Sequence, residues 1–113
     1  MDSLWEKTKI REIIMIKDKY NINKEEREKV IRNYFKVENG DEKLSILPGK
    51  EKKKVIVLKY IMKNFKGNTK YDYKQINQKL KEIYFDHTTI RRHLIDYGFM
   101  ERTRDGKYYW VKE

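Results

Sequence analysis

Apolar residues recur at helical spacing in five segments of this chain, at residues 4–19, 24–35, 51–65, 73–84 and 87–97. An apolar side chain at every third or fourth position forms one buried face of a helix. Four of the segments follow a residue whose side chain can cap a helix: Ser3, Asn23, Asp72 and Asp86. Gly67 and Gly98 stand where a left-handed residue ends a helix. The pattern therefore predicts five helices.

The period changes after Gly98, where β-prone residues at 99–103 and 107–111 flank Asp105-Gly106, a strong hairpin signal. We expect two shorter strands, at 43–47 after the Asn39-Gly40-Asp41 turn and near Lys70-Tyr71, to complete one small sheet with this hairpin. Three helices followed by a β-hairpin is the element order of a winged helix. The predicted fold is α+β, mainly α, with a winged helix-turn-helix domain and an N-terminal helical extension.

Pro48-Gly49 marks the expected domain boundary, because this is the only proline in the chain. Residues 1–47 would form the N-terminal helical extension and residues 48–113 the winged-helix domain. The first helix carries a broad apolar stripe that needs a partner, either the rest of the chain or a second copy: Leu4, Ile10, Ile13, Ile14 and Ile16. We therefore predict a homodimer through the N-terminal helix. An alternative, that residues 4–35 form a DNA-reading helix-turn-helix of their own, lacks a basic surface.

The positive charge is concentrated in the second half of the chain. The net charge is +10, with a pI of about 9.6; residues 1–48 hold eleven Lys/Arg and ten Asp/Glu, whereas residues 49–113 hold seventeen and eight. Phosphate backbones bind such surfaces by releasing counterions, so double-stranded DNA is the expected partner. The alternative is that a chain rich in Lys, Ile, Asn and Tyr reflects biased codon usage alone.

Several classes of protein are not expected from this sequence. It has no cysteine for a disulfide, a thiolate zinc site or a nucleophile, and its longest apolar run, Ile13–Ile16, is far short of the ~20 residues of a membrane span. The start of the chain lacks the pattern of a signal peptide. Lys50 follows Gly49 without a glycine-rich loop, and His87 and His93 project about 240° apart on one helix. We expect a cytoplasmic protein that is not an enzyme, with no metal, cofactor or membrane partner.

Residues 47–110 resemble a bacterial family called domain of unknown function 2087, often fused to helix-turn-helix regulators. The matching positions are Pro48, the Lys run 52–54, Phe65, Tyr71, Ile76-Asn77, Leu80, Asp86, Ile90-Arg91-Arg92, Leu94, Asp96-Tyr97-Gly98, Glu101-Arg102, Asp105-Gly106 and Tyr109-Trp110. The resemblance implies a winged helix and a role in transcription, without an assigned chemistry. Tyr73 and Gln75 stand where the family usually has acidic residues, which favours DNA contact.

The candidate DNA-binding residues lie in three groups. The third helix of the domain offers Thr88, Thr89, Arg91 and Arg92, the hairpin offers Arg104 and Lys107 with Arg102 beside them at the turn, and the start of the first domain helix offers Lys52, Lys53 and Lys54. Arginine reads guanine with two hydrogen bonds in the major groove, and Arg92 lies opposite the buried stripe of its helix. Lysines at a helix start oppose its dipole, which a nearby phosphate would explain.

Each group also has a structural interpretation. Arg91 and Arg92 could pair with Asp86 or Asp96 and hold their helix in place, and the lysines could form a solvated face. Tyr108, Tyr109 and Trp110 could stack on bases, but alternation along a strand favours core and sheet surface, with Tyr109 and its neighbours on opposite faces.

The leading hypothesis is a DNA-binding transcriptional regulator, with the third domain helix in the major groove and the wing on the backbone or minor groove. The alternative is a protein interaction module of a regulatory complex that does not bind DNA directly.

Overall fold

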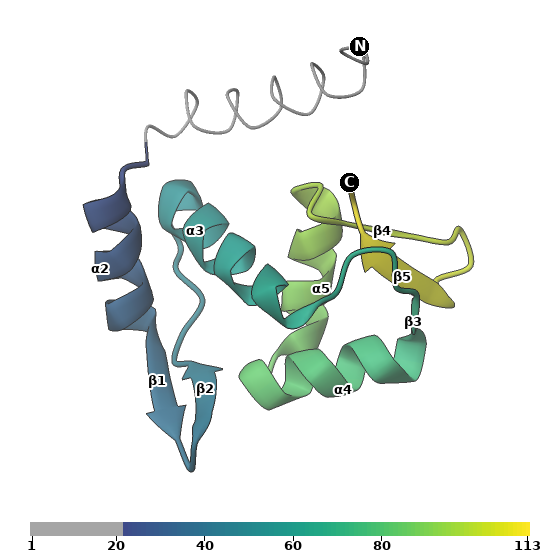
Figure 1. The fold of residues 1–113 in the computed structure, drawn as a ribbon, viewed down its shortest axis with the longest axis horizontal. Coiled ribbons are helices and arrows are strands. Elements are labelled where there is room, and N and C mark those ends of the chain that lie inside the picture. Colours follow the sequence, from purple (N-terminus) through teal and green to yellow (C-terminus); the bar gives the residue numbers. More distant parts are fainter. Residues whose placement is uncertain (1–21) are drawn as a thin grey trace.

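The computed structural model describes residues 22–113, which form four helices and two small antiparallel sheets (Figure 1). The helices are α2 (Lys24–Tyr34), α3 (Glu51–Ile61), α4 (Tyr73–Ile83) and α5 (His87–Asp96), with a 3-10 turn η1 (Met62–Asn64) after α3. The strands are β1 (Phe35–Glu38), β2 (Asp41–Leu44), β3 (Tyr71–Asp72), β4 (Met100–Arg102) and β5 (Tyr108–Val111). This confirms the α+β class. The helix predicted at 4–19 lies outside the described residues.

Helix α2 ends at Tyr34, one residue before its predicted end, and the chain turns to strand at Phe35. Asn23 caps α2 as predicted, its side-chain oxygen accepting the amide hydrogen of Glu26 at 2.8 Å. Strands β1 and β2 then form a hairpin around Asn39 and Gly40, both in the left-handed region with φ of 51° and 84°. This two-residue turn matches the twist of paired strands. Strand β1 was missed because Phe35 continues the helical spacing of the apolar residues Val30, Ile31 and Tyr34, so it was assigned to the helix.

The predicted single sheet is wrong, because β2 pairs only with β1 and stands apart from the C-terminal hairpin (Figure 1). Phe35 faces Leu44 across β1 and β2, and both side chains are buried in the core, which keeps this hairpin against the helices. The second sheet has the order β3-β5-β4. Tyr71 of β3 pairs with Tyr109 of β5, so the short strand expected near Lys70-Tyr71 is confirmed.

Helix α3 ends four residues earlier than expected, at Ile61. The next turn tightens to 3-10 geometry, with the amide of Phe65 donating to the carbonyl oxygen of Met62 at 3.1 Å. This turn brings the ring of Phe65 edge-on to Tyr71, with 5.3 Å between centroids. The left-handed residue that follows is Asn68, with φ of 54°, so the prediction of a left-handed Gly67 is wrong.

Helices α3, α4 and α5 pack around one core whose apolar positions follow the predicted spacing. Asp72 and Gln75 form the expected capping box of α4, each side chain accepting the other residue's amide hydrogen. Each of the three helices contributes fully buried side chains, and Met100 of β4 joins them: Val57, Leu58, Ile61, Ile76, Leu80, Ile90, Leu94 and Met100. Val30, Phe35 and Leu44 belong to the same core. The described N-terminal elements therefore share their buried surface with the three helices.

Across residues 22–113, none of the helices combines the length and apolar character that crossing a bilayer requires.

A polar cluster joins β2 to α3 and its 3-10 turn. The Glu42 carboxylate accepts hydrogen bonds from the Tyr60 hydroxyl, at 2.8 Å, and from the Lys63 ammonium, which lies 3.8 Å from the centre of the Tyr60 ring. Partial burial raises the pKa of Glu42, but the hydrogen bonds from Lys63 and Tyr60 and the charge of Lys63 outweigh it and hold this pKa below its ordinary value of 4.5. The cluster therefore favours the charged carboxylate in the folded protein.

Replacing Glu42 with glutamine is expected to lower the free energy of unfolding by ~1 kcal/mol or less at neutral pH, since the ion pair is partly exposed. A carboxylate whose pKa is lower in the folded state stabilises above its unfolded pKa, and this contribution disappears as the pH falls through the folded pKa. The difference between the wild type and Glu42→Gln should thus shrink below pH 4.5 in urea unfolding. Glu38→Gln, at an exposed position of β1, should leave stability unchanged; a pH-independent difference for Glu42→Gln would contradict the assignment.

Candidate nucleic-acid interface

Helix α5 is fixed at both ends and along one face. The Asp86 carboxylate accepts hydrogen bonds from the amide of Thr89, at 3.3 Å, and from its hydroxyl, at 2.7 Å. These bonds, with smaller contributions from the charges of His87 and Arg92, hold the pKa of Asp86 below its ordinary value. Gly98, with φ of 77°, follows the other end. Ile90 and Leu94 are buried, so the opposite face of α5 is turned outward with Arg92 exposed on it.

The structure gives Thr88 and Thr89 different surroundings. Both are half-buried, but the Thr89 hydroxyl is engaged by Asp86 as part of the helix cap, whereas Thr88 has no such bond. Both threonines are predicted to contact DNA, but the hydroxyl of Thr89 already has a structural role in the helix cap. The capping preference of Asp86 was readable from the sequence, but the second bond from the hydroxyl was not.

Arg91 is held against α4 and not by the acidic residues proposed as its partners. Its guanidinium donates to the side-chain oxygen of Asn77 and lies 5.0 Å from the centre of the Tyr73 ring. None of the three ion pairs found in residues 22–113 includes Arg91 or Arg92, so pairing with Asp86 or Asp96 is not observed within 4.0 Å. Tyr73 and Asn77 are four positions apart on α4, and this spacing was the sequence signal for a shared face.

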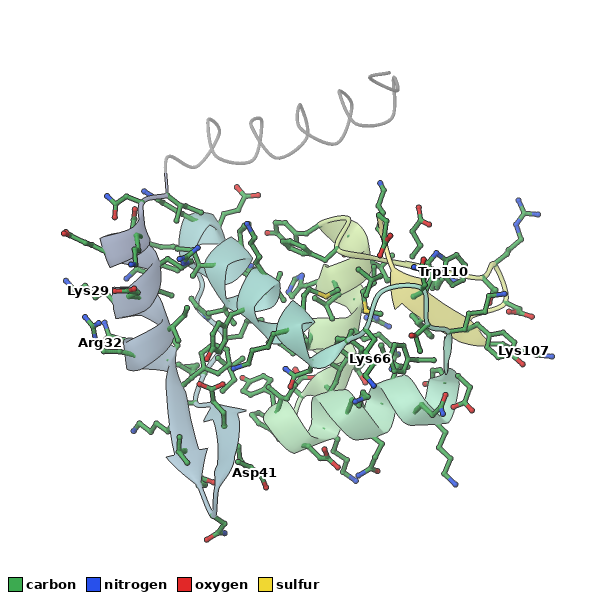
Figure 2. The ribbon with its side chains drawn as sticks, in the orientation of Figure 1. Lys29, Arg32, Asp41, Lys66, Lys107 and Trp110 are labelled. Atoms are coloured by element: carbon green, nitrogen blue, oxygen red, sulfur yellow. The ribbon has the colours of Figure 1, made fainter. Side chains whose placement is uncertain are left out.

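The turn of the β4–β5 hairpin is stabilised by hydrogen bonds to Asp105. The Asp105 carboxylate accepts hydrogen bonds from the Thr103 hydroxyl, at 2.6 Å, and from the amide of Lys107, at 3.0 Å, and these two bonds hold the pKa of Asp105 below its ordinary value. Gly106 takes the left-handed conformation, with φ of 74°. Arg104 and Lys107 are exposed, and Lys107 lies at the outer end of the hairpin (Figure 2). The predicted turn is confirmed.

Arg102 was predicted only as a cation beside the hairpin turn, but it also lies on the side of the hairpin that faces α5. Its Nη1 donates to the carbonyl oxygens of Thr103 and Arg104, at 3.0 and 3.1 Å. A hollow of about 390 Å³ separates the hairpin from α5, and we call it the arginine hollow; its lining residues are Arg91, Arg92, Ile95, Asp96, Arg102 and Tyr109. Arg102 faces Tyr109 across the strands, so the register that buries Tyr109 also turns Arg102 toward α5.

The lysine run at the start of α3 is divided between two neighbours. Lys52 forms an ion pair with Glu26, at 2.7 Å, and Lys53 lies 5.9 Å from the centre of the Tyr34 ring, so both approach α2. Lys54 lies close enough to His93 of α5 to affect its titration. Partial burial lowers the pKa of His93 first, and the charge of Lys54 lowers it further. Of these three lysines, Lys54 is thus the one associated with α5.

The aromatic residues of β5 alternate between two faces, as predicted for a strand of a small sheet. Tyr109 is buried, Tyr108 is exposed, and Trp110 is half-buried with its indole nitrogen donating to Glu101 at 3.0 Å. Lys70 lies within about 6 Å of the Tyr108 and Trp110 rings. Tyr109 is therefore part of the core and unavailable for stacking on bases.

In the part of the chain that the structure describes, no three His, Cys, Asp or Glu side chains are grouped as metal ligands. The exposed cations of α5 and the hairpin, Arg92, Arg102, Arg104 and Lys107, are groups that suit anionic oxygen ligands.

Comparison with known proteins identifies a family without an assigned activity. No curated protein and no solved structure matches the chain. A protein-family model described as "Uncharacterized protein conserved in bacteria (DUF2087)" matches residues 43–111, from β2 to the end of β5. This span is more than half of the chain and includes α3, α4, α5 and the three-stranded sheet. The chain therefore belongs to the DUF2087 family of uncharacterized bacterial proteins.

Proposed function

We propose that this protein is a DNA-binding transcriptional regulator in which residues 48–113 form a winged helix. The element order α3-β3-α4-α5-β4-β5 and the strand order β3-β5-β4 support this proposal. In a winged helix the third helix enters the major groove while the hairpin contacts the backbone or the minor groove. Helix α5 takes the first role here and the β4–β5 hairpin takes the second.

The observation that carries the proposal is that α5 and the hairpin present cations on adjoining surfaces, none of which forms an ion pair within 4.0 Å among the described residues. Arg91, Arg92 and Arg102 line one hollow, while Arg104 and Lys107 are exposed at the hairpin turn. The three ion pairs within residues 22–113 all lie at or before Lys63, so they neutralise none of these groups. Unneutralised cations gain most from contact with phosphates, because binding then releases the condensed counterions of DNA.

The predicted residues take distinct roles in this proposal. Arg92 reaches a base edge from the outward face of α5, and Thr88 reaches a neighbouring phosphate. Arg104 and Lys107 contact the backbone or minor groove, and Lys54 contributes a cation beside α5. Thr89 and Arg91 act as positioning residues through Asp86, Asn77 and Tyr73. Lys52 and Lys53, which approach α2, act through their long-range field.

Fluorescence anisotropy with a random-sequence duplex should give binding that weakens steeply as salt is added. Arg92→Ala should lower the affinity about three- to tenfold, because it removes one exposed cation from the interface. Arg32→Ala is the matched control, since Arg32 is also an exposed helical arginine but lies on α2, away from the hairpin (Figure 2). Its affinity should equal that of the wild type. Absent or salt-independent binding, or equal losses in both variants, would sink the proposal.

A second candidate function, a protein interaction module without direct DNA binding, is favoured by a groove between α2 and α3. The groove measures about 600 Å³; its apolar lining residues are Ile22, Ile31, Val55 and Ile56, and its charged rim includes Lys24, Arg27, Glu28, Lys59 and Lys63. An apolar floor with a charged rim suits an amphipathic helix. We propose that the stripe on residues 4–16 of a second copy fills this groove and makes a homodimer.

Sedimentation equilibrium at high micromolar concentration should show a dimer of the full chain. Ile31→Asp should shift it to monomer, since a carboxylate in the groove is costly to desolvate. Val37→Asp is the control: Val37 is an apolar residue of β1 that is 72% exposed, and it does not line the groove. A monomeric wild type would refute the dimer. If the combined Arg91→Ala and Arg92→Ala variant keeps its DNA affinity while loss of residues 1–20 abolishes assembly, the interaction module replaces the DNA-binding proposal.

A further inference from the structure

The arginine hollow has a composition that the general positive charge of the domain does not explain. Three of its six lining residues are arginines, contributed by α5 and by β4, and Asp96 is its single acidic residue. Ile95 and Tyr109 provide apolar surface between them; Ile95 is half-buried and Tyr109 is buried. The hollow therefore combines an excess of positive charge with walls that exclude part of the solvent.

Two of these arginines are held in place without losing their charge. Arg102 donates to two backbone carbonyl oxygens, and Arg91 donates to the amide oxygen of Asn77 while its guanidinium lies over the Tyr73 ring. These partners are neutral, so they orient the guanidinium groups and leave their positive charge unpaired. Among the described residues, Arg92 also has no carboxylate within 4.0 Å.

The remaining donors match one class of ligand. Arg102 makes its two bonds through Nη1, which leaves Nη2 and Nε for an external acceptor. A guanidinium presents its donors as a planar fork that binds two oxygens of the same phosphate, and charge-assisted bonds of this kind are stronger where water is partly excluded. Because a water molecule takes up about 30 Å³ in the liquid, a hollow of about 390 Å³ has room for a phosphate and its ester substituents.

We propose that the arginine hollow is a phosphate-binding site in which Arg102 is an anchoring residue, together with Arg91 and Arg92. When the phosphate belongs to a DNA strand, this inference rests on the proposed function and identifies where the backbone crosses between α5 and the hairpin. When it belongs to a separate phosphorylated ligand, the same three guanidinium groups bind it. The chemistry is common to both sources, and two measurements distinguish them.

The first measurement tests the site itself, with inorganic phosphate as the probe. Phosphate is titrated against chloride at constant ionic strength while the arginine Nε–H signals of the full chain are followed by NMR. The signals of Arg91, Arg92 and Arg102 should shift with saturation, whereas those of Arg27 and Arg32 on α2 should remain in place. Arg102→Lys, which keeps the charge but removes the planar fork, should weaken the response of Arg91 and Arg92 at least severalfold.

The second measurement identifies the source of the phosphate from the salt dependence of duplex binding. Loss of one phosphate contact lowers the slope of log affinity against log salt by about 0.9. Arg102→Ala should show this reduction if the hollow holds a strand of DNA, whereas Arg32→Ala, on α2 and outside both the hollow and the proposed interface, should leave the slope unchanged. An unfolding curve establishes that Arg102→Ala is folded, and Arg102→Lys replaces it if it is not.

The outcomes separate this inference from the proposed function. Phosphate-induced shifts with a reduced slope support a DNA backbone phosphate, and shifts with an unchanged slope support a separate phosphorylated ligand. A wild type that responds to phosphate but does not bind duplex DNA overturns the proposed function and leaves the site standing. Shifts no larger than those of Arg27 and Arg32 overturn the phosphate site, whatever the duplex measurement gives.

Discussion

The burial of one stripe on α5 is the constraint on which the candidate interface depends. Ile90 and Leu94 are held in a core that also contains Leu80 of α4 and Leu58 of α3, and burying an aliphatic side chain of this size stabilises by roughly 1.5–3 kcal/mol. Rotation of α5 about its axis would expose this stripe to water. The outward direction of Arg92 is therefore a consequence of packing on the other side of the helix.

The same core sets the position of the C-terminal hairpin. Met100 and Tyr109 are buried on the inner face of the three-stranded sheet, and the pairing of Arg102 with Tyr109 turns that arginine toward α5. A shift of β5 by one residue would move Tyr109 to the solvent-facing side of the sheet and place Tyr108 or Trp110 opposite Arg102. Packing of the sheet and of the helix together thus creates a hollow whose positive charge comes from two consecutive elements, α5 and β4.

Local signals in the sequence predicted most of the helices and turns. The caps at Asn23, Asp72 and Asp86 are hydrogen bonds between residues three positions apart, and the turn at Gly106 is determined by the Asp105-Gly106 dipeptide. Residues close in sequence are therefore enough to predict them. The buried apolar positions of α3, α4 and α5 could also be predicted, because helical spacing determines which side chains share a face.

What the sequence did not reveal are pairings between distant segments. Strand β2 pairs with β1 instead of the C-terminal hairpin because Phe35 and Leu44 are buried together in the core. Lys52 and Lys53 approach α2, and Arg91 bonds to Asn77, since helix packing brings those groups within reach. Arg102 was predicted as a cation of the hairpin, but its place beside the arginines of α5 was not, since it depends on how β4 packs against α5, which no local pattern encodes.

The contrast between Arg91 and Arg92 gives neighbouring residues different entropic costs of binding. An unrestrained arginine side chain loses up to about 2 kcal/mol of rotamer freedom when a ligand fixes it. For Arg91, Asn77 and Tyr73 impose much of that loss when the chain folds, whereas Arg92 keeps its freedom until contact is made. Helix α5 thus offers one guanidinium of fixed geometry beside one that adapts, so a single face combines a rigid reference point with tolerance for differently placed acceptors.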